Sequence, residues 1–131
     1  MKNLLKDILM GLLLFIVTLI LELLVSILLG QPDPTKVSDE IRGANVSMMF
    51  LGAAIPIGLA AFAAAALLKP ETKGRALRMG IIWTAIFVGL NVLTGLGNDT
   101  MGIIFLGIGI YASIVLLFIG PIAYARFRKL P

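Results

Sequence analysis

Four long apolar runs, nearly free of charge, dominate this sequence of 131 residues. A hydrocarbon core about 30 Å thick needs about 20 helical residues, so each run is long enough to span a bilayer. Only helices or closed β-barrels satisfy every backbone polar group in lipid, and these runs lack the alternating pattern of barrel strands. We therefore predict an all-α membrane protein, a four-helix transmembrane bundle in one domain (1–131), with helices at about 8–29, 44–68, 77–96 and 101–125.

The composition agrees with this fold class and removes several kinds of chemistry. Only 14% of the residues are charged, and 60% are hydrophobic, whereas soluble domains are about 25% charged. The absence of cysteine and histidine excludes disulfides and the commonest metal and haem ligands, so no metal or cofactor is expected. The first run exceeds the roughly 7–15 residues of a signal-peptide core and has no Ala-x-Ala site after it, which favours a retained span.

The connections predict which helices are neighbours. Short polar connectors at 69–74 and 97–100 predict that the second and third helices, and the third and fourth, are antiparallel neighbours. The longer, charged segment 35–43 is expected to form an interfacial helical turn before the second helix. Pro56, close to Gly58, is expected to kink that helix because it removes one backbone hydrogen bond.

The eleven basic residues are distributed unequally between the two sides. The positive-inside rule places the richer side, with both termini, in the cytoplasm, and it argues against insertion in both orientations. Because these residues flank apolar runs, the net charge of +4 indicates membrane topology rather than nucleic-acid binding. We expect an integral protein of a bacterial cytoplasmic membrane. The richer side carries nine of the basic residues, Lys2, Lys6, Lys69, Lys73, Arg75, Arg78, Arg126, Arg128 and Lys129, and the other carries Lys36 and Arg42.

Small and polar residues form one stripe on each predicted helix. In lipid, small residues let helix backbones approach closely, so the simplest interpretation is that the stripes face one another inside the bundle. Packing alone explains most of this signal. The residues assigned to helix packing are Gly11, Gly52, Pro56, Gly80, Gly95, Gly102, Gly109, Ser113 and Gly120.

Glu22 is the one charged residue inside the four apolar runs, about 21 Å past Ile8 at 1.5 Å per residue. A charge placed so deep costs about 2.5–3.5 kcal/mol on insertion scales, so this carboxyl must be protonated, paired or open to water. Asn91 lies at a similar depth, and Arg42 and Lys36 could reach down from the outer surface. The functional hypothesis is a proton or cation site formed by Glu22, Asn91, Thr18 and Thr84; the alternative is a carboxyl that joins helices or contacts a partner.

Two charged surfaces complete the candidates. Arg75, Arg78, Arg126, Arg128 and Lys129 form a cytoplasmic basic rim, which is typical of topology and of attraction to anionic lipid head groups. The outer side carries an acidic cluster, Asp33, Asp39 and Glu40, whose spacing matches no calcium loop.

Three functions are compatible with the sequence. A non-enzymatic role through a partner membrane protein or self-association is favoured, because small-residue stripes are abundant and chemistry is scarce. A small oligomeric transporter or channel that uses Glu22 is the alternative. A lipid-modifying enzyme would need a second titratable group near Glu22, such as Asp39 or Glu40 from the outer loop.

Overall fold

Helices account for nearly all of the chain. The computed structural model describes residues 2–33, 36–105 and 107–131, and the predicted turn residue Thr35 lies outside them. The helices are α1 (Lys2–Leu28), α2 (Asp39–Leu68), α3 (Lys73–Gly97), α4 (Met101–Phe105) and α5 (Gly109–Phe127). Within the described residues, α1, α2, α3 and α5 are long and apolar enough to cross a membrane. The predicted all-α, four-span fold class is therefore confirmed.

Polar caps extend two helices beyond their apolar runs. The Ile41 N–H donates to Ser38 Oγ at 3.4 Å, so that α2 begins at Asp39 and includes most of the segment predicted as a separate turn. The Arg75 N–H donates to Thr72 Oγ1 at 3.1 Å and fixes the start of α3. A side chain that accepts a bond from the first turn satisfies an otherwise unpaired donor, so these helices start in polar rather than apolar sequence.

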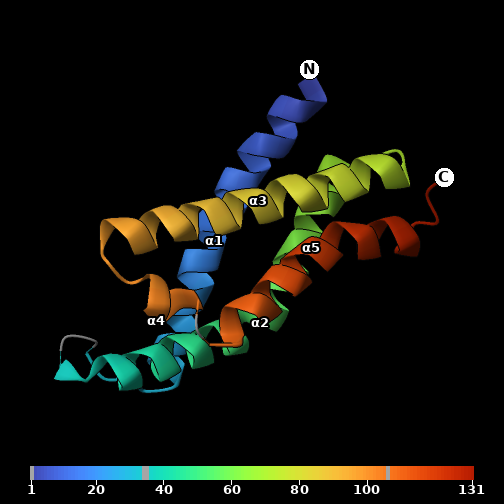
Figure 1. Cartoon of the computed structure of the whole chain (residues 1–131). Helices are drawn as coiled ribbons and strands as arrows, with labels where there is room; N and C mark the ends of the chain where they lie inside the picture. Colours follow the sequence, from blue (N-terminus) through green and yellow to red (C-terminus); the bar gives the residue numbers. More distant parts are fainter. Residues whose placement is uncertain (1, 34–35, 106) are drawn as a thin grey trace.

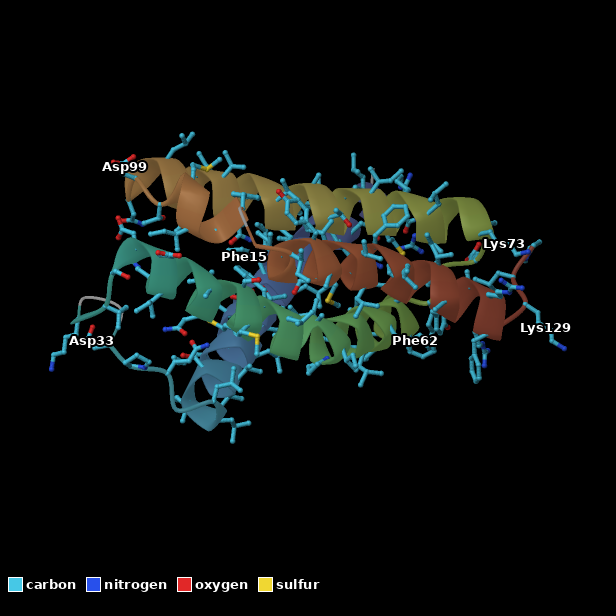
Figure 2. The ribbon with its side chains drawn as sticks, turned by 60° about the horizontal axis from the view of Figure 1, so that its bottom comes forward. Phe15, Asp33, Phe62, Lys73, Asp99 and Lys129 are labelled. Carbon is cyan, nitrogen blue, oxygen red and sulfur yellow. The ribbon has the colours of Figure 1, made fainter. Side chains whose placement is uncertain are left out.

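Three helices lie side by side, and α5 is the middle one. Figure 2 shows α3, α5 and α2 as successive layers, and Figure 1 shows α1 crossing them steeply. The predicted neighbourhood of the third and fourth spans is confirmed by extensive packing of α3 against α5. The prediction that the second and third spans pack directly against each other is wrong, because the α2 and α3 backbones hardly approach and the two helices meet only through long side chains such as Phe50 and Phe87.

Close approaches of α5 to both neighbours explain this separation. A Cβ atom at Gly120 of α5 would lie 2.5 Å from Ala61 Cβ of α2. On the other flank, a Cβ at Gly80 of α3 would lie 2.9 Å from the Phe118 carbonyl oxygen of α5. Small residues at both contacts let α5 sit tightly between α2 and α3, and α1 packs against these two helices.

The fourth span is broken, although its apolar run is continuous in sequence. The Gly109 N–H donates to Ser47 Oγ of α2 at 3.1 Å, and a Cβ at Gly109 would collide with the Ser47 carbonyl oxygen. The α2 backbone thus occupies the space next to the break. The Tyr111 hydroxyl donates to the Phe105 carbonyl at 2.7 Å, which satisfies an acceptor at the end of α4. Predicting one helix over 101–125 was therefore wrong; Leu106, within that range, lies outside the described residues.

The two ends of the bundle differ in the charged residues that they carry. Figure 2 shows Lys73 and Lys129 at one end, here called the basic end, and Asp33 and Asp99 at the other, the acidic end. The Lys73 N–H donates to the Pro131 carbonyl at 2.9 Å, so the C-terminus lies beside the start of α3 at the basic end. Which end faces the cytoplasm stays a prediction.

Candidate functional site

One face of α1 carries all its buried residues. Asp7, Gly11, Leu14, Thr18 and Glu22 are spaced by three or four positions and fall within about 80° of arc on the helix. This face of α1 packs against α2 and α3. It begins and ends with a carboxylic acid, so both acids of α1 are turned into the protein.

The Glu22 side chain is buried without a partner. The residue is 5% exposed, and its Oε1 atom is inaccessible and accepts no hydrogen bond from the described part of the chain. No lysine or arginine nitrogen of the described residues lies within ion-pairing distance of it. Since buried carboxyl groups are normally hydrogen-bonded or paired, this one requires an explanation.

Glu22 lines a cavity of about 440 Å³ near the acidic end, here called the Glu22 cavity. The polar part of its wall comes from α2, α3 and the connector after α3, and its apolar part comes from α2 and α4. Arg42 is the other charged side chain among its described lining residues. With Glu22, the polar lining residues are Arg42, Asn91, Thr94, Asn98 and Thr100, and the apolar ones are Val46, Met49, Phe50, Ile103 and Ile104.

The structure brings two of the four predicted site residues together. Asn91 lines the Glu22 cavity, and its Nδ2 donates to the Phe87 carbonyl at 2.8 Å. Thr18 and Thr84 are not among the residues that line it. The Thr18 hydroxyl donates to the Phe15 carbonyl of its own helix at 2.7 Å, and Thr84 Oγ1 is buried without a hydrogen bond from the described residues.

Sequence reasoning missed part of the cavity wall. Asn91, Thr94 and Asn98 are spaced by three and four residues, so helical periodicity on α3 could have grouped them. Thr100 follows in the connector, and its backbone N–H donates to the Gly95 carbonyl at 2.7 Å. The missed residues extend the polar surface from Asn91 towards the acidic end.

Below the cavity, the bundle is filled with large side chains. Phe50 lines the cavity and packs edge-on against Phe87, with ring centroids 6.4 Å apart. Phe15 of α1 also packs against Phe87, with ring centroids 6.3 Å apart. Trp83, one helical turn further on, is 1% exposed. In this arrangement aromatic packing separates the Glu22 cavity from the basic end.

The second acid of α1 has a different environment, which the sequence analysis did not find. Asp7 is completely buried, and its two carboxylate oxygens lie 3.2 Å from Arg75 Nη2 and 3.3 Å from Arg78 Nη2. The Trp83 indole N–H donates to the Asp7 backbone carbonyl at 2.8 Å. Two residues of the predicted basic rim thus reach the buried Asp7, and of these Arg75 is half-buried while Arg78 is exposed, as are Arg126, Arg128 and Lys129.

The predicted packing residues lie mostly at close helix contacts. The Ser113 hydroxyl of α5 donates to the Phe50 carbonyl of α2 at 2.8 Å, and Pro56 is half-buried inside α2. In Figure 1 the α2 ribbon changes direction along its length, from its teal to its green part. Three further predicted packing glycines lie close to a neighbouring side chain, because an added Cβ there would come within 3.0 Å of it. They are Gly11 (next to Ile86 and Trp83), Gly52 (next to Val25) and Gly95 (next to Met101).

A second cavity, of about 700 Å³, opens at the acidic end, and Gly102 lines it. Its wall includes Asp39, Glu40 and Asp99, so the two acids considered as partners for Glu22 face a neighbouring space. No group of three or more acids in the described residues is arranged to hold a metal ion. Ile103 of α4 lines both cavities, which makes α4 the wall between them.

No family model matches this chain, and no curated protein or solved structure matches it either. The function has to be argued from the Glu22 cavity and its surroundings.

Proposed function

We propose that this protein is a small membrane transporter in which Glu22 binds a proton or a cation that arrives from the acidic end. One observation carries the proposal: a nearly buried carboxyl group, with no partner among the described residues, faces a cavity of about 440 Å³ whose walls are partly polar. Each molecule in liquid water takes up a volume of about 30 Å³, so the cavity has room for several water molecules and a ligand. Intramembrane acids of this kind commonly mark ion or proton pathways.

The chemistry of the site is an exchange at one carboxyl group. An isolated carboxylate is costly in a medium of low dielectric constant, so without a ligand Glu22 is more stable when it holds a proton. When a cation binds, the O–H bond breaks, the proton passes to water in the cavity, and the carboxylate pairs with the cation. Proton and cation compete for the same oxygen, which is the elementary step of coupled exchange.

A complete transport cycle requires a second arrangement of the helices. The aromatic packing of Phe15, Phe50 and Phe87 closes the way from the cavity to the basic end. Helix α4 forms part of the cavity wall and is a helix separate from α5. Movement of that wall, or contact with a second copy, would have to open the opposite side.

Carbodiimide labelling tests the proposal, because dicyclohexylcarbodiimide modifies protonated carboxyl groups in apolar surroundings. We expect the purified protein in lipid nanodiscs to be labelled at Glu22, and sodium or methylammonium ions to slow this labelling. Asp7 serves as the internal control, since both of its carboxyl oxygens are paired with arginines and it does not line the cavity. Mass spectrometry locates the label; a Glu22 that stays unmodified, or is modified at a rate no cation affects, contradicts the proposal.

Transport itself is measured in liposomes that contain a trapped pH-sensitive dye. An imposed sodium or methylammonium gradient should drive proton movement through the wild-type protein, and Glu22→Gln should abolish it. Arg126→Gln removes an exposed charge at the basic end and is the matched control, with flux expected at the wild-type level. Unchanged flux through Glu22→Gln would reject the role of Glu22.

Self-association is the second candidate, either as the whole function or as a requirement for transport. It is supported by the large side chains that fill the bundle between the Glu22 cavity and the basic end, because a route across the membrane would then have to form with the help of a second copy. Native mass spectrometry of the detergent-solubilised protein tests it. A strictly monomeric chain that co-purifies with nothing would count against this candidate.

A further inference from the structure

The Glu22 cavity contains an acidic and a basic side chain that do not meet. Arg42, in the first turns of α2, and Glu22, on α1, both line it, but no ion pair within 4.0 Å joins them. Within the described chain, the Arg42 guanidinium makes no side-chain hydrogen bond or ion pair. The cavity therefore has an acidic pole on α1 and a basic pole on α2, and neither has a side-chain partner among the described residues.

This arrangement is unusual for charged groups inside a protein. A buried or half-buried charge is normally paired, because desolvation without compensation is unfavourable. A carboxyl group and a guanidinium in one cavity would be expected to form an ion pair with each other unless the backbone holds them apart. Here they project from separate helices across a space that a third group could occupy.

The size of the space and the ligand set argue against a bare metal ion as that group. Calcium takes about 6–8 oxygen ligands at about 2.3–2.6 Å, and magnesium needs nearly ideal octahedral geometry. The Glu22 cavity offers one carboxylate in about 440 Å³, together with a guanidinium that repels cations. An organic ammonium group needs fewer fixed ligands, since its three N–H groups can donate to Glu22 and to neighbouring amide or hydroxyl oxygens such as those of Asn91 and Thr94.

We propose that the Glu22 cavity binds a zwitterion, with its ammonium group at Glu22 and its carboxylate or phosphate at Arg42. This inference rests on the proposed function and specifies the ligand of the same site. The guanidinium can hold either oxyacid through two parallel hydrogen bonds. The apolar wall of Val46, Met49 and Ile104 accommodates the carbon chain between the two charges. On binding, Glu22 gives its proton to water, and one proton is released for each ligand bound.

Two sources share this chemistry: free amino-acid-like solutes and the head group of phosphatidylethanolamine. Nanodiscs distinguish them. In phosphatidylcholine, whose quaternary ammonium cannot donate an N–H bond, the site is free for solutes, and β-alanine or phosphoethanolamine should protect Glu22 from carbodiimide. If phosphatidylethanolamine nanodiscs protect Glu22 without any solute, the lipid head group is the ligand. Either outcome supports a zwitterion site.

Matched single-charge ligands test the need for both poles. In phosphatidylcholine nanodiscs, we expect phosphoethanolamine or β-alanine to protect Glu22 at concentrations about tenfold lower than ethylamine does, because a charge-assisted bond at Arg42 is added. Acetate should not protect it. Arg42→Gln should remove the advantage of the zwitterions and leave protection by ethylamine, whereas Arg126→Gln should leave both unchanged. Arg42→Lys keeps the positive charge and should retain part of the zwitterions' advantage. This variant keeps the test informative if Arg42→Gln fails to fold.

The outcomes separate this inference from the proposed function. One outcome contradicts the zwitterion site and leaves the cation site standing. In it, ethylamine and sodium protect Glu22 as well as any zwitterion does in phosphatidylcholine, both in the wild type and in Arg42→Gln. Phosphatidylethanolamine, in addition, gives no protection. If Glu22 is never labelled in any lipid, or nothing protects it, both are wrong. Circular dichroism and gel filtration establish that each variant is folded.

Discussion

Helix α1 carries two buried carboxyl groups on the same face, and their surroundings are opposite. Asp7 and Glu22 are 0% and 5% exposed and lie about 22 Å apart along the helix axis. Asp7 meets Arg75 and Arg78, so its charge is compensated at the basic end. Glu22 meets no partner in the described chain and faces a cavity. Burial is the same in both cases, and pairing is what differs.

The difference separates a structural acid from a chemically available one. A paired acid contributes to stability and offers nothing to a ligand, because its oxygens are already occupied. An unpaired acid in a cavity contributes little to stability, but its oxygen can exchange a proton for a cation. Three changes test this difference: removing the ion pairs of Asp7, giving Glu22 an ion-pair partner, and replacing the Glu22 carboxyl by a neutral amide.

The largest effect is expected at Asp7. Asp7→Asn removes the charge between two arginines and should destabilise the protein by about 2–3 kcal/mol. This lies below the value for fully buried pairs because the Arg78 side chain is 47% exposed. Unfolding in mixed detergent micelles with increasing sodium dodecyl sulfate, followed by circular dichroism, measures the change.

A double-mutant cycle provides the control for Asp7. Arg75→Gln should reproduce most of the loss, because the Arg75 side chain is only 14% exposed, and Arg78→Gln should cost less. Combined with Arg75→Gln, Asp7→Asn should lose less than the sum of the two single changes. Additive losses would mean that the ion pairs do not carry the stability of this end.

An intermediate effect is expected when Glu22 receives a partner. Asn91→Lys places an ammonium group in the Glu22 cavity and should pair with the carboxyl, so that Glu22 resembles Asp7. Carbodiimide labelling of Glu22 should fall about tenfold or more, since the paired carboxylate no longer holds a proton. Asn91→Met, of similar size and without charge, is the matched control and should leave labelling near the wild-type rate. Equal labelling of the two variants would show that residue 91 does not reach Glu22.

The smallest effect on stability is expected at Glu22 itself. Glu22→Gln removes a carboxyl that has no partner in the described chain, so the free energy of unfolding should change by less than about 1 kcal/mol. The same detergent unfolding assay measures it beside Asp7→Asn. A loss as large as that of Asp7→Asn would reveal a structural role for Glu22 and weaken the transporter proposal.

The candidate site was partly predictable, for a clear reason. Glu22 was found because a charge in an apolar run stands out, and Asn91 because depth along a helix follows from residue count. Thr18 and Thr84 were grouped with them by helical spacing alone, which assigns a face but not the helix opposite. Asp7 was missed because it lies just outside the apolar run, although it continues the stripe of Gly11 and Leu14 by one turn.

The sequence by itself determined the number and approximate positions of the membrane spans and the stripe by which α1 packs. These properties belong to single helices, because apolar length and helical periodicity depend on residues close together in the chain. The tertiary structure decided that α5 separates α2 from α3, that Ser47 lies where the fourth span breaks, and that Asp7 has partners while Glu22 has a cavity. Those outcomes depend on distances between helices, which arise only when the side chains of all of them compete for the same space.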